Sequence, residues 1–307
     1  MIVRPRPGLL RLFLIVRGSV LQRIFPQVLV VMALSAAVVL AHRSNPGRVP
    51  SFDGAPFALL GIALSVFLGF SNNAAYDRWW EARKAWGDLI AAGRDLARLT
   101  LLLDLRGAAE AAARRALLTD VMAFAHALVL HLRADASREG LERTLPPDLA
   151  AAAQDTPSLP VLLLADMGGR LARLRAEGHV SDIEFARLDD ELKAMNRMLA
   201  TCERILGTPV PFGYTLLLHR TAYLFCFLLP FGFADVLGWG TPLAAGLVAY
   251  TFFGLDALGS ELEEPFGTMP NDLPIAALAL GIERDMRVAL GERDLPPAAV
   301  PADFILE

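Results

Sequence analysis

Four stretches of the chain are each long and apolar enough to cross a lipid bilayer, and no other feature restricts its possible folds as strongly. A helix needs roughly 20 apolar residues to span about 30 Å of hydrocarbon. The stretches are residues 24–41, 56–75, 221–237 and 241–258. No strand-like alternation of apolar and polar residues occurs elsewhere. The sequence therefore predicts an all-α membrane protein with four transmembrane helices in each subunit.

Composition agrees with this prediction and excludes several functions. Of the 307 residues 54% are hydrophobic and 20% are charged, which is too apolar for an ordinary soluble domain of this length. The net charge is −4 and the arginines are scattered among acids, so we expect no nucleic-acid partner. The two cysteines, Cys202 and Cys226, are too few for a zinc site, and we expect no metal and no cofactor. No catalytic motif is present, so we do not expect an enzyme.

The third span needs an unusual helix. His219 and Arg220 interrupt an apolar run that begins near Pro211. We therefore predict one long helix whose first turns lie outside the bilayer. The distribution of arginines gives the orientation, because Lys and Arg concentrate on the cytoplasmic side. Five arginines precede the first span, two lie in the loop after it, and none lies between the last two spans, which predicts that both termini are cytoplasmic: Arg4, Arg6, Arg11, Arg17, Arg23, then Arg43 and Arg48.

The remaining residues form one polar region and a tail. Residues 76–220 carry heptad-like apolar spacing over 89–105, 108–132 and 182–206, which predicts a helical cytoplasmic region. The tail, residues 259–307, is broken by prolines, and we expect it to be extended or partly disordered. We interpret residues 1–307 as a single domain.

The second span carries two neighbouring ridges of side chains. Ile62, Val66 and Phe70 recur every fourth residue and form a narrow apolar ridge. Beside it lies a ridge of small residues, which allow helices to approach closely in lipid: Gly61, Ser65 and Gly69. The apolar ridge either faces lipid or a helix core, or lines a pore.

Polar residues follow the apolar ridge without a break in the helix pattern. Asn72, Asn73 and Asp77 come directly after Phe70. Such groups are costly beside lipid and are tolerated where they line water or protein. The change from apolar to hydrated residues favours a dry constriction at Ile62, Val66 and Phe70 that opens into a wet vestibule.

Three segments resemble signature stretches of the bestrophin family in its bacterial branch. They are GFSNNAAYDRWWEARKAWGDL, GTPVPFGYTLLLHRT and EEPFGTMPNDLPI. The resemblance extends from about Arg17 to Asp272. It implies a homopentameric ion channel in the bacterial inner membrane, with four spans per subunit and both termini in the cytoplasm. It also implies that the second span lines a central pore and that Ile62, Val66 and Phe70 form its hydrophobic neck.

The resemblance implies a second, cytosolic constriction made by one apolar side chain per subunit. We place this aperture at Val180, with Ile183 as the alternative. Calcium gating is not expected, because the segment after Pro265-Phe266-Gly267 holds one acid where calcium-activated relatives have a run, and Ca²⁺ takes about six to eight oxygen ligands.

The resemblance implies that the permeant ions are monovalent cations, Na⁺ and K⁺. The polar groups nearest the neck are amides and a carboxylate, which favours cations weakly. An anion channel of the same fold remains an alternative. Two other classes also remain open, a secondary transporter and a nonconducting membrane scaffold. The transporter is disfavoured because the second span lacks the broken helix such proteins use.

Overall fold

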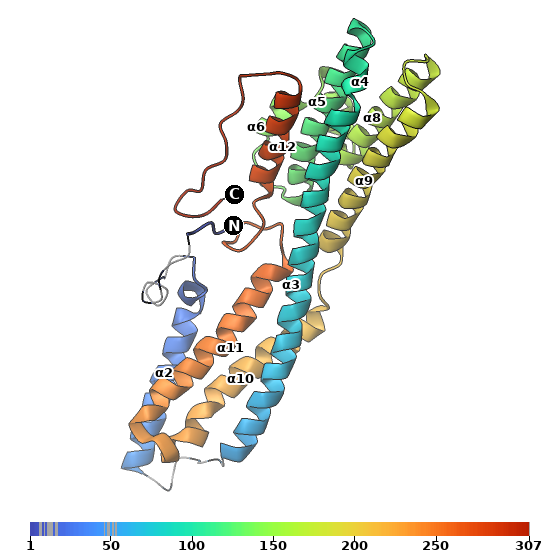
Figure 1. The fold of residues 1–307 in the computed structure, drawn as a ribbon. Helices are drawn as coiled ribbons and strands as arrows, with labels where there is room; N and C mark the ends of the chain where they lie inside the picture. Colours follow the sequence, from blue (N-terminus) through green and yellow to red (C-terminus); the bar gives the residue numbers. More distant parts are fainter. Residues whose placement is uncertain are drawn as a thin grey trace. The chain divides into compact units, whose positions relative to one another are not determined.

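The computed structural model describes residues 1–5, 8, 10, 15, 18–45, 47, 50, 52 and 54–306. Arg6, Arg11, Arg17 and Arg48, which enter the orientation argument, lie outside the described residues. Helices dominate the described part of the chain, which contains no extended sheet (Figure 1). The all-α fold is therefore confirmed. In chain order, the longer helices are α2 (Leu21–Ser44), α3 (Gly54–Leu99), α5 (Ala108–Leu132), α8 (Leu159–Ala176), α9 (Asp182–Gly207), α10 (Phe212–Leu237), α11 (Thr241–Glu263) and α12 (Ile275–Ala289).

The chain divides into two compact units, and the boundary between them falls inside α3. The apolar unit comprises Arg4–Trp79 and Pro209–Pro265. The polar unit comprises Met1–Val3, Trp80–Thr208 and Phe266–Glu307. Helix α3 itself is a single helix of 46 residues with no proline after its first turn. Short helical segments complete the polar unit: α4 (Leu101–Asp104), α6 (Glu139–Thr144), η1 (Pro147–Leu149) and α7 (Ala152–Asp155).

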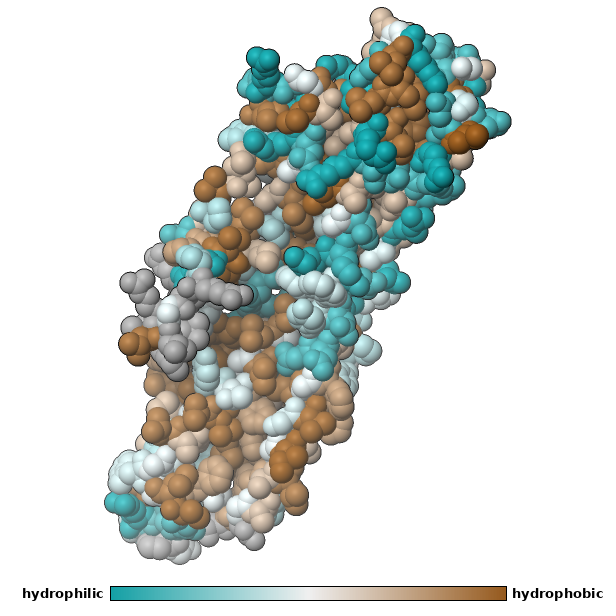
Figure 2. Space-filling view, viewed as in Figure 1, coloured by the Kyte–Doolittle hydropathy of each residue, from teal (hydrophilic) through white to brown (hydrophobic). Residues whose placement is uncertain are grey.

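The apolar unit contains α2, the first part of α3, α10 and α11, the last two joined by the short turn η2 (Gly238–Gly240). Its core is aromatic: the ring of Phe225 in α10 lies 6.4 Å from that of Phe57 in α3 and 5.4 Å from that of Phe252 in α11. The outer surface is also apolar, as the brown side chains in Figure 2 show, and Leu59 and Leu247 are mostly exposed. A unit that is apolar both inside and outside is suited to lipid.

Glycines set the spacing of these helices. A Cβ atom at Gly232 would lie 2.8 Å from the Phe57 ring, and one at Gly246 would lie 2.7 Å from Met32. These helices therefore approach to a distance that only a glycine permits. Because lipid supplies little hydrophobic driving force between helices, such close contact provides much of their attraction.

By length and composition, four helical runs of the described chain could cross a membrane, and they differ from the prediction in one respect. They are 21–44, 54–104, 108–132 and 212–263. The first, second and fourth contain all four predicted spans, because α10 and α11 follow each other with only η2 between them. The run 108–132 is α5, in which 67% of the most apolar window is buried within the protein. Its apolar surface is covered by protein, so we keep α5 in the polar unit.

The polar unit is built around α5, which α8, α9 and α12 contact. The predicted helices at 108–132 and 182–206 are confirmed as α5 and α9. The prediction of an extended tail was wrong over Ile275–Ala289, which forms α12. Its apolar residues recur at helical spacing, and Ile275, Ile282 and Met286 are buried. This burial stabilises a helix that lies between two proline-containing segments.

Two charged clusters lie inside the polar unit. The carboxylate of Glu283 in α12 is wholly buried and accepts hydrogen bonds from Arg143 of α6 and Arg287, while His126 of α5 contacts it at 2.8 Å. Burial alone raises the pKa of Glu283, but the hydrogen bonds together outweigh it and hold the pKa at about 2. Asp120 of α5 is also buried and accepts a 3.0 Å bond from Arg170 of α8.

Candidate pore-lining face of α3

The predicted neck residues lie on the face of α3 opposite the core of the apolar unit. The buried residues of this helix include Leu64 and Leu68, whose exposed fractions are 3% and 2%. By contrast, Ile62, Val66 and Phe70 are 65%, 49% and 62% exposed. At about 100° per residue, these three lie on average about 180° around the axis from Leu64 and Leu68. The ridge is therefore an apolar face that the described part of the chain leaves exposed.

The three residues of the small-residue ridge differ in their surroundings. Gly61 packs inside the chain, since a Cβ there would lie 3.1 Å from Cζ of Phe225. The Ser65 hydroxyl donates to the Gly61 carbonyl at 2.7 Å, so its polar group is satisfied within the helix. Gly69 has nothing within 4 Å of the same position. Ser65 is exposed and Gly69 has open surroundings, so these two residues, unlike Gly61, are available to a neighbouring subunit.

The structure separates the three predicted vestibule residues. Asn73 and Asp77 are exposed, and their spacing puts them within about 20° of the centre of the neck ridge. Asn72 is half-buried and about 120° away, and its Nδ2 donates to the Leu68 carbonyl at 2.9 Å. The interpretation of Asn72 as a vestibule residue is therefore not supported by its position. Its side chain packs inside the apolar unit.

Burial distinguishes the two candidates for the cytosolic aperture. Val180 is 2% exposed, and its N–H donates to the Leu174 carbonyl at 3.2 Å. Ile183 is 77% exposed and lies in the first turn of α9. A capping box fixes that turn, because Ser181 and Glu184 each hydrogen-bond the other's backbone N–H. A side chain that narrows a pore between subunits must be exposed in the single chain, so Ile183 is the better candidate.

The segment after Gly267 is held by protein groups. Arg133, directly after α5, donates to the carbonyls of Phe266, at 3.0 Å, and Gly267. The carboxylate of Asp272 accepts a 2.6 Å bond from the N–H of Met269. Among the described residues, no group of three or more His, Cys, Asp or Glu side chains is placed to hold a metal ion.

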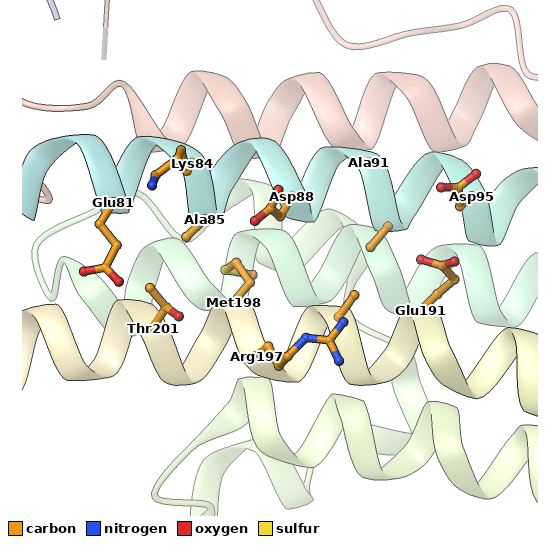
Figure 3. A pocket seen from close by; sticks show the side chains of 12 residues that line it. Glu81, Lys84, Ala85, Asp88, Ala91, Asp95, Glu191, Arg197, Met198 and Thr201 are labelled. Carbon is orange, nitrogen blue, oxygen red and sulfur yellow. The ribbon is translucent and has the colours of Figure 1, made fainter. Parts of the chain in front are cut away.

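Sequence reasoning missed a groove in the polar unit between α3 and α9. Its cavity measures about 520 Å³, and carboxylates from both helices line it, as Figure 3 shows. Glu81, Asp88 and Asp95 of α3 recur every seventh residue, which was the available signal. Burial raises the pKa of Glu191 from α9, and the nearby charge of Asp95 adds to the effect. Lys84 and Arg197 balance part of the negative charge.

These features define the class of protein: an α-helical, multispan membrane protein with an exposed apolar ridge that continues into polar residues. The family model for bacterial and fungal bestrophin proteins matches residues 1–288. The chain belongs to the bestrophin family, which is a family of ion channels.

Similar proteins cover nearly the whole chain. A voltage-dependent anion channel-forming protein of Mesorhizobium japonicum is 45% identical, over 99% of this chain and 96% of its own length. The voltage-dependent anion channel-forming protein YneE of Escherichia coli is 42% identical, over 98% of each. The crystal structure of a bacterial bestrophin homologue from Klebsiella pneumoniae is 36% identical and superimposes with a TM-score of 0.82, covering 88% of this chain and 100% of that one.

Proposed function

We propose that this chain is one subunit of a pentameric ion channel whose pore is lined by the exposed face of α3. The observation that carries the proposal is the apolar ridge of Ile62, Val66 and Phe70 opposite the core. One copy of a helix cannot enclose a pore, but several copies arranged around an axis can. Membership of a channel family supports the same interpretation.

The chemistry of the ridge describes how such a pore would work. Three apolar rings offer water few hydrogen-bond partners, so the constriction tends to dewet and an ion passing through it is poorly solvated. Asn73 and Asp77 follow on the same face and supply polar partners as soon as the ion leaves the rings. Ile183 is the proposed second constriction, in the cytosol.

Two proposals concern the sign of the permeant ion. The relatives are named as anion channel-forming proteins, so anion conduction is the better supported of the two. Cation conduction, of Na⁺ and K⁺, is the second candidate. The acids at Asp77 and along the groove beside α9 favour it, because carboxylates that line a water-filled path raise the local concentration of cations.

A reversal-potential measurement decides between the two signs. Purified protein in a planar bilayer with a tenfold NaCl gradient gives a potential that approaches about 59 mV for ideal selectivity, with opposite sign for Na⁺ and Cl⁻. Discrete conductance steps support a channel. Slow saturable flux without steps would instead indicate a transporter, and no current at all would indicate a scaffold.

We further propose that the channel lies in the bacterial inner membrane with both termini in the cytoplasm. The arginines near the N-terminus support this orientation. Accessibility of a single engineered cysteine tests it: a cysteine at Ser137, which is exposed in the polar unit, should react only after the membrane is permeabilised.

The pore face is tested by substitution within one helix. Replacing Ile62, Val66 and Phe70 together with alanine should widen and wet the neck and raise the single-channel conductance. Phe70→Ala should have the largest single effect because it removes the most volume from each ring. Phe67→Ala is the matched control, since Phe67 is 53% exposed but lies about 100° from Val66.

Substitutions in the neighbouring small-residue ridge should affect assembly rather than conductance. Gly69→Leu should impair assembly by separating packed helices. The proposal is wrong if the triple-alanine channel assembles and conducts like the parent while changes at Gly61, Ser65 or Gly69 alter permeation. That result would mean that the small-residue face of α3, and not the apolar ridge, lines the pore. For the aperture, Ile183→Ala should change permeation, whereas Val180→Ala should lower stability and leave permeation unchanged.

A further inference from the structure

A small polar cavity lies inside the apolar unit, on the side of α3 that faces away from the neck ridge. It measures about 20 Å³ and is bounded by α3, the segment from Val210 to Leu218, and α11. A cavity needs roughly 10–15 Å³ of this kind of space to hold one water molecule. The space is therefore sufficient for a single water molecule or for one ion of similar size.

Six of the residues that line this cavity carry oxygen atoms in their side chains. The side chains that bring them are Ser71, Asn72, Thr215, Asp256, Ser260 and Glu263. The described residues that line it include no lysine, arginine or histidine. Hard cations such as Na⁺ and K⁺ take carboxylate, carbonyl and hydroxyl oxygens, whereas an anion requires N–H donors or positive charge. The donor set matches a cation.

Asn72 presents its oxygen because its nitrogen is already used. Its Nδ2 donates to the Leu68 carbonyl, which leaves Oδ1 directed at Gly259 of α11. A Cβ at Gly259 would lie only 3.1 Å from that oxygen. The glycine thus leaves the space beside Oδ1 open. The hydroxyl of Ser260 donates to the Asp256 carbonyl at 3.0 Å, so its lone pairs also remain available as ligands.

Asp256 contributes negative charge within a helix of the apolar unit. Its side chain is 15% exposed, and Nδ1 of His219 lies 2.7 Å from its Oδ2. An ionisable residue in such a position is costly, and it commonly marks a site that binds an ion or a proton. The second carboxylate of the lining, Glu263, accepts a hydrogen bond from the Val210 N–H and lies near Arg78, so its charge is partly balanced. Asp256 with neutral oxygens suits a monovalent ion, because a divalent ion in so small a space would have to give up its waters for few charged ligands.

We propose that this cavity binds one monovalent cation of the size of Na⁺, held by Asp256, by Oδ1 of Asn72 and by the hydroxyl of Ser260. The ion bridges α3 and α11 behind the neck, since Asn72 belongs to α3 and the other two ligands to α11. It is a structural site separate from the pore face, and it does not depend on the proposed function. Occupancy stabilises the contact between the two helices.

Thermal unfolding of the detergent-solubilised protein tests the site. The probes are NaCl and N-methyl-D-glucamine chloride at equal ionic strength. Na⁺ at about ten times its dissociation constant should raise the apparent Tm by roughly 2–4 °C, because a ligand that binds only the folded state stabilises it by mass action. Asp256→Asn should abolish the difference between the two salts. Ser260→Ala removes a single ligand and should reduce it.

Asp235→Asn is the matched control. Asp235 also pairs with a histidine of the apolar unit, His42, but it lies outside the cavity lining. This variant should keep the full Na⁺ effect. The proposal is overturned if the parent shows no difference between the salts, as a buried water would give, if Mg²⁺ or Ca²⁺ replaces Na⁺ in the effect, or if Ser260→Ala and Asp256→Asn retain it unchanged. Because the readout is stability, a channel that fails to conduct leaves this test intact.

Discussion

Replacing Glu283 with glutamine should destabilise the polar unit by about 3 kcal/mol at neutral pH. The carboxylate is wholly buried, and its pKa falls from an ordinary value of 4.5 to about 2. Lowering a pKa by one corresponds to about 1.4 kcal/mol of added preference for the ionised form. Glutamine resembles the protonated acid in shape, so it loses that preference and leaves Arg143 and Arg287 facing a neutral amide.

The pH dependence has a defined sign. A group whose pKa is lowered by folding stabilises the protein above its unfolded pKa, and that contribution is lost as the pH falls through the folded pKa. The difference in stability between parent and Glu283→Gln should therefore be constant above about pH 4.5 and shrink between pH 4.5 and about 2. Thermal unfolding in detergent, followed by circular dichroism from pH 7 to pH 3, measures the difference; at neutral pH it should be roughly 6–12 °C in Tm.

Glu139→Gln is the matched control, because Glu139 pairs with the same Arg143 at 3.0 Å but is 81% exposed. An exposed pair contributes less than about 1 kcal/mol, so this variant should unfold close to the parent. Equal effects of the two substitutions, or a Glu283→Gln effect of the same size at pH 7 and pH 3, would refute the argument that buried hydrogen bonds hold Glu283 ionised.

Three further outcomes are expected. Burial raises the pKa of Asp120 to about 7 from an ordinary value of 3.8, so the unfolded chain loses this proton at a lower pH than the folded protein does. The free energy of unfolding should therefore fall as the pH rises from about 4 to 7. Asp120→Asn should flatten that slope in a series of Tm values measured against pH. Light scattering of the purified complex should give five copies of the 33.2 kDa chain, and a monomer or dimer alone would exclude the pore proposal. A calcium chelator should leave the current unchanged, because the segment after Gly267 has one acid, Asp272, which already accepts a bond from Met269; closure by chelator and recovery with Ca²⁺ would contradict this.

Much of the fold follows from local patterns. The four apolar stretches and the apolar spacing of α5 and α9 were sufficient to place these helices, because burial of one stripe imposes a helical period and burial of a whole surface gives a continuous apolar run. The recurrence of Ile62, Val66 and Phe70 at every fourth residue likewise predicted that they share one face of α3. The same arithmetic separates Asn72 from Phe70 by about 200°, so its inward position was available from spacing alone.

Other features depend on partners that are distant in sequence. Helical spacing places Glu283 on the buried face of α12, but two of the groups that hold its carboxylate, Arg143 and His126, lie 140 and 157 positions away, and no local pattern identifies them. The difference between Val180 and Ile183 depends on how the turn after Gly178, whose φ is +77°, leads into α9. A short turn carries no periodicity, so burial in the three-dimensional structure was needed to distinguish them. Helix α12 was overlooked because the prolines on both sides dominated the interpretation of the tail.

The close contacts at Gly232 and Gly246 have a consequence for how this protein can vary. In a library that samples every substitution, the large outward-facing side chains of the apolar unit should tolerate changes of size, whereas its smallest inward-facing residues should not. A water-soluble core shows the opposite pattern, in which large buried side chains are the least tolerant. Outward-facing Leu59 and Leu247 can be exchanged for other apolar residues, because lipid chains adapt to any shape. Replacement of either glycine should be costly, since even one methyl group meets Phe57 or Met32 at under 3 Å and one of these side chains must shift. The smallest side chains in the unit are therefore the ones under the strictest selection.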